Sequence, residues 1–394
     1  MTHHTRRQRF LKNILSFLVA VVLLELMAQA VKAYVLPPKW WKVAATDRLE
    51  PGYKGPIDYA DTVEGRGARL GVLCVNSLGF RGPERRLSNE RAPNRLLIYC
   101  LGSSTTFGWG ASADAKTYPA QLDKNILARL KSSSLENGGQ GGSPYGIQRP
   151  SHPISQVLPF QWEKSLEVIN AGVPGNNSQS ELRILEQDLP SLKPDIVILW
   201  SGWPDWGHYM QPTGRKIKHA RDPLALLKKS ASYRCCEYLR DLITARPAPP
   251  SDRELAARTG LGGFRTEALE KFRVNLEKMI GLCRKHATFP VVLGLATPLR
   301  MDPSTLSPLA RSQAANRLNA FPNATQLELQ KGILDFDAAI KRLCIKTHTD
   351  YIPPELLPCD PVHFIDGVHL TDEGNAALAE AIASQIAALF PLPY

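Results

Sequence analysis

Three side chains suited to acyl transfer follow apolar segments of this 394-residue chain. Ser104 lies in a Gly-Ser-Ser-Thr turn after the apolar run 96–101, and Asp366 and His369 lie close together near the C-terminus. A serine hydroxyl becomes a nucleophile at neutral pH when a histidine accepts its proton and a carboxylate orients that histidine. Asp366 can reach one ring nitrogen of His369 and leave the other facing Ser104. We therefore predict a Ser104–His369–Asp366 triad, with His363 as the rival base.

Such a nucleophile needs hydrogen-bond donors for the oxyanion that develops on the substrate. The backbone N–H groups of Ser104 and Gly172 are the candidates, because each follows a predicted strand. Losing one such donor typically costs about 3 kcal/mol of barrier.

The elements that must position these residues alternate between short apolar strands and amphipathic helices. We predict strands at 96–101, 166–170, 196–200, 291–295 and near 351–352, and helices at 118–131, 180–192, 266–286, 325–348 and 371–389. This order indicates a parallel sheet, whose ligands bind at the carboxyl ends of the strands. The predicted fold class is α/β: a flavodoxin-like three-layer α/β/α sandwich with a central parallel sheet of about five strands, plus an N-terminal anchor helix.

Four short segments resemble the sequence blocks of the SGNH (GDSL-like) hydrolases, in the family's order. They are Gly-Ser-Ser-Thr-Thr-Phe-Gly at 102–108, Asn-Ala-Gly at 170–172, Ser-Gly-Trp-Pro-Asp at 201–205 and Asp-Gly-Val-His-Leu at 366–370. The resemblance covers roughly residues 95–389, and it implies that Ser104 is the nucleophile, that Gly172 donates to the oxyanion, and that Asp366 and His369 complete the triad. Residues 76–81 also resemble the stretch ahead of this domain in anchored members.

Two positions depart from the family pattern. Ser103 stands where the family usually has aspartate, which leaves the nucleophile in place. Pro204 stands where the family usually has the asparagine that donates to the oxyanion, and proline offers no donor. Asn176 or Asn177 could supply the missing donor. Without one, the chain could instead be a catalytically impaired scaffold or binding protein with the same fold.

The N-terminus predicts a membrane segment. Basic residues at 6–9 precede a mostly apolar stretch at 14–34, which is long enough to span a bilayer. Basic residues on the N-terminal side favour a cytoplasmic N-terminus and an exported remainder. A signal peptide cleaved after Ala30, giving a secreted or periplasmic protein, is the alternative.

The remaining sequence sets the domain boundaries and the partners. We expect a basic stub and anchor at 1–36, a membrane-proximal lead-in at 37–94 and the hydrolase domain at 95–394, with an insert at about 203–264.

The basic residues behind the net charge of +11 are scattered along the chain, and no nucleic-acid module is present. The seven cysteines lack the paired spacing of a zinc site, so we predict neither a metal nor a cofactor. The expected partners are an ester substrate on a glycan or lipid and the membrane itself; the oligomeric state stays open.

Overall fold

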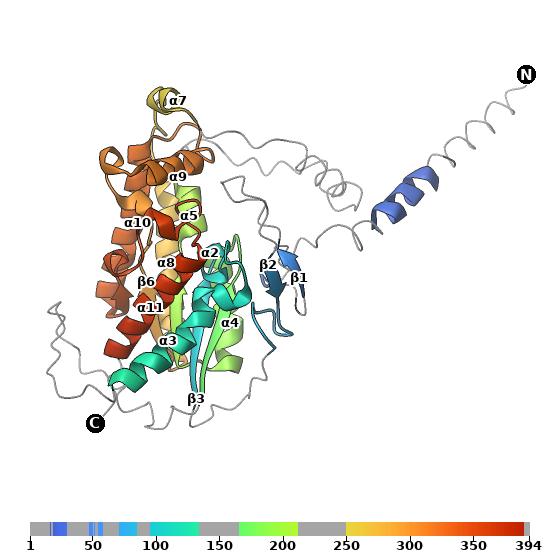
Figure 1. Ribbon diagram of the computed structural model, residues 1–394, viewed down its shortest axis with the longest axis vertical. Coiled ribbons are helices and arrows are strands. Elements are labelled where there is room, and N and C mark those ends of the chain that lie inside the picture. Colours follow the sequence, from blue (N-terminus) through green and yellow to red (C-terminus); the bar gives the residue numbers. More distant parts are fainter. Residues whose placement is uncertain are drawn as a thin grey trace, which may run out of the picture. The chain divides into compact units, whose positions relative to one another are not determined.

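A computed structural model describes residues 16, 19–29, 47–49, 51, 54–57, 71–84, 95–133, 165–211 and 250–389 (Figure 1). The chain forms two compact units, Met1–Lys39 with Gly214–Ala248, and Trp40–Thr213 with Pro249–Tyr394. In the first unit the description covers residue 16 and the helical residues 19–29. All the other elements described below belong to the second unit.

The second unit contains the predicted parallel sheet. Its strands are β3 (Arg95–Gly102), β4 (Ser165–Gly172), β5 (Ile196–Trp200), β6 (Phe289–Leu293) and β7 (Asp350–Ile352). They lie in the order β4-β3-β5-β6-β7, and every neighbouring pair is parallel. This is the flavodoxin-like strand order, in which the order reverses beside the first strand and opens a crevice there. The α/β class and the five-stranded parallel sheet are confirmed.

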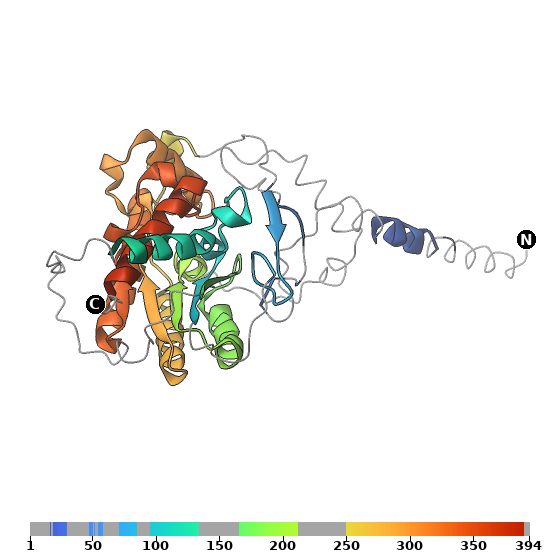
Figure 2. The ribbon, with the colours of Figure 1, turned by 60° about the horizontal axis from the view of Figure 1, so that its bottom comes forward.

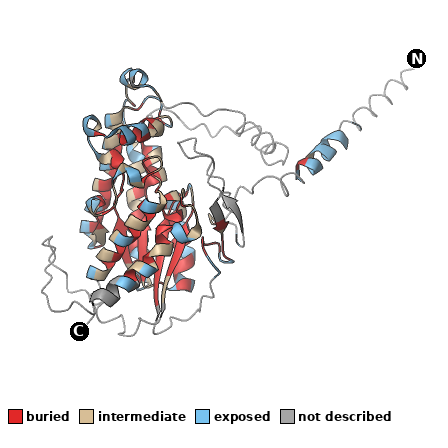
Figure 3. Ribbon diagram, viewed as in Figure 1, coloured by how far each residue is buried: buried red, intermediate tan, exposed pale blue. Residues whose placement is uncertain are grey.

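Alternate residues of β3 face two separate hydrophobic cores. Leu97, Tyr99 and Leu101 pack with α4 (Ser178–Leu192) and α8 (Thr266–Lys285). Leu96, Ile98 and Cys100 pack with α3 (Tyr118–Ser133) and α11 (Asp372–Leu389). Figure 2 shows the two helix pairs on opposite faces of the sheet, and the strands between them are almost wholly buried (Figure 3). Burial on both faces explains why these strands read as continuous apolar runs.

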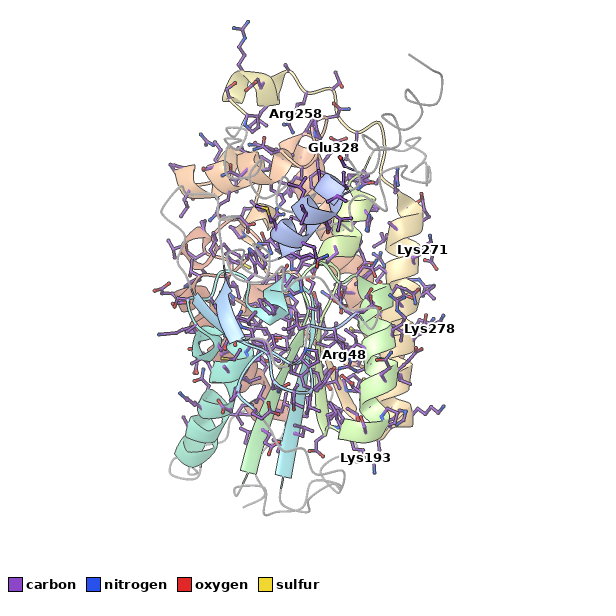
Figure 4. The ribbon with its side chains drawn as sticks, turned by 90° about the vertical axis from the view of Figure 1, so that its right-hand side faces the viewer. Arg48, Lys193, Arg258, Lys271, Lys278 and Glu328 are labelled. Carbon is purple, nitrogen blue, oxygen red and sulfur yellow. The ribbon has the colours of Figure 1, made fainter. Side chains whose placement is uncertain are left out.

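Two of the longer helices begin at residues whose side chains cap them. The Asn177 side chain accepts the Ser180 N–H at the start of α4, and Thr325 and Glu328 form a capping box at the start of α10 (Gln326–Thr347). On the outer face of α8, Lys271 and Lys278 project into solvent (Figure 4).

Several short elements surround this framework. They are β1 (Lys54–Ile57), β2 (Gly71–Cys74), α2 (Ser104–Phe107), α5 (Trp203–Tyr209), α7 (Asp252–Ala256), α9 (Pro308–Leu318) and the 3-10 turns η1 (Asp114–Lys116), η5 (Pro298–Arg300), η6 (Pro303–Thr305), η7 (Pro354–Leu356) and η8 (Pro361–His363). β1 and β2 pair antiparallel.

The structure describes parts of the expected insert and of the expected lead-in. The insert was expected to begin at Trp203, yet Trp203, Trp206 and Tyr209 are buried in the core from α5. Residues 212–249 of that expected insert lie outside the described residues. Likewise, residues 71–84 of the expected lead-in belong to the same compact unit as the sheet.

The expected anchor at 14–34 is described only in part. In the described part of the chain, no helix has both the length and the hydropathy needed to cross a bilayer.

Candidate active site

The turn after β3 places Ser104 at the carboxyl edge of the sheet. Gly102, the last residue of β3, pairs with Gly172 of β4 and Trp200 of β5, so these three strands end at the same level. A side chain at Gly102 would place its Cβ 2.6 Å from the Trp200 carbonyl oxygen, so only glycine fits. The chain then turns into the four-residue helix α2, which begins at Ser104. Ser104 therefore lies at the switch point of the strand order.

The structure brings the three predicted triad side chains together. The Ser104 Oγ lies 2.8 Å from His369 Nε2, and His369 Nδ1 lies 2.8 Å from Asp366 Oδ2. When the neutral imidazole carries its proton on Nδ1, Nε2 accepts the Ser104 hydroxyl proton. His363, the rival base, has no side-chain hydrogen bond to Ser104 or Asp366 within the described residues.

A tight turn fixes Asp366 relative to His369. Asp366 Oδ1 accepts the backbone N–H groups of Val368 at 3.0 Å and His369 at 2.8 Å. The Ile365 N–H donates to the His369 carbonyl at 2.8 Å, which closes the turn. Gly367 adopts φ +80°, a conformation that favours glycine. The short spacing noticed in the sequence thus corresponds to one hydrogen-bonded turn.

The carboxyl group of Asp366 is held ionised. Its Oδ2 also accepts a hydrogen bond from Arg317 Nη2 at 2.9 Å, from the end of α9. Burial alone would raise the pKa of Asp366, but the charges of His369 and Arg317 and the hydrogen bonds from His369 outweigh it and hold this pKa well below its usual range. An ionised carboxylate at this position can stabilise an imidazolium during the reaction.

The backbone N–H of Gly172 is not available as the oxyanion donor that the sequence suggested. Its N–H donates to Asn170 Oδ1 at 3.1 Å, and it is buried against α2, where a Cβ would lie 2.6 Å from Phe107 Cα. A donor already engaged inside the fold cannot reach a substrate oxyanion. Gly172 instead allows the close contact between β4 and α2.

Gly175, in the loop that follows, is exposed with φ +79°, and its N–H has no acceptor among the described residues.

The two asparagines proposed to replace the missing donor have structural roles. Asn176 is buried, and its Nδ2 donates to the Asp47 carbonyl at 2.9 Å. The Asn177 side chain caps α4. Pro204 occupies the first turn of α5, where a missing N–H costs nothing. Asp205 is structural, because its carboxylate accepts both the N–H and the hydroxyl of Ser178 at 2.8 Å.

Arg81 is a component of the site that motif reading missed. Its side chain is 1% exposed and reaches α2 from the segment ahead of β3. Nη1 donates to the carbonyl oxygens of Phe107 at 3.0 Å and Gly108 at 2.9 Å, Nε donates to Asp114 at 2.7 Å, and the guanidinium lies over the Phe107 ring. Arg81 therefore holds the C-terminal end of the helix whose first residue is Ser104. The Asn-Ser-Leu-Gly-Phe-Arg stretch was its only sequence signal.

An aromatic side chain lies beside the imidazole of His369. The ring of the half-buried Trp109 lies 6.2 Å from that of His369, and the backbone N–H of Trp109 donates to the Ser104 carbonyl at 2.8 Å. No cluster of His, Cys, Asp and Glu within the described ranges could hold a metal ion.

These observations define an α/β protein with a Ser-His-Asp hydrogen-bonded chain at the switch point of a parallel sheet. Comparison with known families agrees: the profile of the GDSL-like Lipase/Acylhydrolase family matches residues 100–377. The chain belongs to this hydrolase family.

Comparison with individual proteins gives weaker likenesses. A search of curated proteins returned no match. Among solved structures, an acetyl xylan esterase is 14% identical, with 74% of this chain and 100% of that chain covered and a TM-score of 0.37. A carbohydrate acetylesterase from Sinorhizobium meliloti is 16% identical, with 75% and 100% covered and a TM-score of 0.38. A GDSL-like lipase from Bacteroides thetaiotaomicron is 12% identical, with 77% and 93% covered and a TM-score of 0.38.

Proposed function

We propose that this protein is a serine esterase that cleaves or transfers an acyl group of an ester through Ser104, His369 and Asp366. The observation that carries the proposal is the 2.8 Å separation of the Ser104 Oγ from His369 Nε2, in a ring whose other nitrogen contacts Asp366. His369 takes the hydroxyl proton as Ser104 attacks the ester carbonyl, and later returns it to the leaving alcohol. Water, or a second alcohol, then releases the acyl group from Ser104.

The oxyanion of this reaction requires donors at the carboxyl edge of the sheet. We propose the N–H groups of Ser104 and Gly175, because neither has an acceptor among the described residues and both follow strands that end beside each other. Gly175 replaces Gly172 in this role. Pro204 leaves the site one side-chain donor short of the family pattern, and this observation favours the second candidate function, a catalytically impaired scaffold of the same fold.

The N-terminal sequence supports a proposal for where the protein acts and on which class of substrate. We propose that residues 14–34 tether the protein to a membrane, with the catalytic unit outside the cytoplasm, because basic residues precede that apolar stretch. A catalytic unit held there would meet esters of envelope glycans or lipids.

Hydrolysis of p-nitrophenyl acetate tests the proposed chemistry. We expect Ser104→Ala to lose turnover by at least about 1000-fold with a nearly unchanged thermal midpoint, since the residue acts in chemistry rather than in packing. Ser103→Ala is the matched control: Ser103 is the buried neighbour, and its hydroxyl has no hydrogen-bond partner among the described residues. Turnover retained in Ser104→Ala, or lost equally in Ser103→Ala, contradicts the assignment. A folded wild type without turnover would support the scaffold.

A further inference from the structure

The helix α9 supports the catalytic turn through two polar side chains. Gln313 and Arg317 lie one helical turn apart, on the same face. Gln313 is buried, and its Nε2 donates to the carbonyl oxygens of Pro361 at 3.0 Å and Phe364 at 2.8 Å. Arg317 contacts Asp366 itself. Gln313 therefore holds the backbone that precedes the catalytic turn, and Arg317 contacts the Asp366 carboxylate within that turn.

Arg317 shares one carboxylate oxygen with the imidazole. Asp366 Oδ2 accepts from Arg317 Nη2 at 2.9 Å and faces His369 Nδ1 at 2.8 Å. The side chains of Arg317 and Asp366 are 21% and 17% exposed, so the pair is partly removed from water. Charges in such a setting interact more strongly than an exposed surface pair. Arginine also stays protonated across the whole working range of an enzyme.

We propose that Arg317 is a positioning residue that sets the pH range in which His369 can act as a base. This inference rests on the proposed function. The positive guanidinium partly offsets the attraction of the Asp366 carboxylate for a protonated His369, and it also repels the imidazolium directly. Both effects disfavour the protonated ring, so the ring remains a base at lower pH than it would beside Asp366 alone.

Other charged groups around the turn do not provide this effect. Asp372, at the start of α11, accepts both the N–H and the hydroxyl of Ser112. His363, on η8, has no ion pair within the described residues. The charges that act on Asp366 are His369 from its own turn and Arg317 from α9, and their effect supports the geometry by lowering the pKa of that carboxyl.

The pH dependence of kcat/KM for p-nitrophenyl acetate tests the proposal, because its acid limb reports the base of the free enzyme. Arg317→Gln should move the midpoint of the acid limb upward by about 0.5 to 1 pH unit, less than the roughly 1 to 3 units that a charge in direct contact can cause, because Arg317 contacts Asp366 rather than the imidazole itself. Arg317→Met is the second neutral variant and should give the same shift. Arg311→Gln, on the same helix and exposed, is the matched control and should leave the midpoint unchanged.

Arg317→Lys separates charge from geometry. It keeps a positive charge, so its midpoint should stay within about 0.2 unit of wild type, even where kcat falls because the guanidinium fork is lost. The proposal is overturned by an unshifted midpoint in a folded neutral variant, by a downward shift, or by a shift in Arg317→Lys as large as that in Arg317→Gln. These results are separate from failure of the proposed function, in which Ser104→Ala would retain turnover.

Discussion

Arg81 offers a test of whether the segment before β3 helps to position the nucleophile. Replacing it with methionine keeps the unbranched apolar stem as far as about Nε and removes the guanidinium. Breaking a buried ion pair from one side costs about 3 to 5 kcal/mol. We expect a loss near the lower end of this range, because each group that accepts from Arg81 still accepts from a second donor. These donors are the Asn170 side chain for the Phe107 carbonyl, the Ala111 N–H for the Gly108 carbonyl and the Cys74 N–H for the Asp114 carboxylate. A loss of about 3 kcal/mol corresponds to a fall in Tm on the order of 5–10 °C.

Activity should fall by more than this loss of stability explains. With its C-terminal end released, α2 can shift, and a displacement of about 1 Å at a nucleophile can cost 100-fold. We expect kcat of Arg81→Met to fall about 10- to 100-fold at a temperature where the protein stays folded, with a smaller change in KM. Tm by calorimetry and steady-state hydrolysis of p-nitrophenyl acetate give both quantities.

Arg48→Met is the control for this experiment. Arg48 also precedes β3 and is also ion-paired, with its Nη1 3.0 Å from Asp188 Oδ2, but that partner belongs to α4 rather than α2. Figure 4 labels this side chain. We expect a comparable loss of Tm and nearly unchanged kcat. Equal losses of kcat in the two variants would refute the positioning argument.

Three further outcomes are expected. Pro204→Asn should raise kcat, up to the roughly 100-fold that one oxyanion donor can contribute, and no change would mean that backbone donors suffice. Glu181→Gln should raise Tm at pH 8: Glu181 is fully buried, and burial raises its pKa well above the usual range although the hydroxyl of Ser201 acts in the opposite direction. A carboxyl with a raised pKa in the fold costs stability above its unfolded pKa of about 4.3, so the gain should vanish near pH 4, and a gain independent of pH would contradict this origin. The full chain should sediment with membranes and resist extraction by high salt, whereas a soluble product beginning at Val31 would show cleavage instead.

The sheet could be predicted because its sequence signal is local. A strand covered on both faces must be apolar at every position, and 96–101 and 196–200 show this directly. The close spacing of Asp366 and His369 was equally local, since one turn contains the whole contact. Ser104 could be placed because it follows a strand immediately.

The contacts that the sequence did not reveal join residues far apart in the chain. Arg317 lies in a stretch that reads as irregular, and nothing nearby in the sequence marks Asp366 as its partner. Gly172 was misassigned because an N–H looks equally available after any strand. Only the fold shows that the Asn170 side chain accepts it. Arg81 was part of a recognised stretch, but its contact with α2 required the packing of that stretch on the sheet.

The central claim is that Ser104 is an activated nucleophile, and covalent labelling tests it most directly. The folded protein would be treated with a fluorophosphonate probe at neutral pH, and the labelled peptide identified by mass spectrometry. We predict one label on Ser104, and a rate of labelling that falls by at least about 100-fold in His369→Ala, because the base within 2.8 Å of the hydroxyl is then missing. A folded wild type that stays unlabelled, or a label on Ser104 that forms equally fast without His369, would contradict the account.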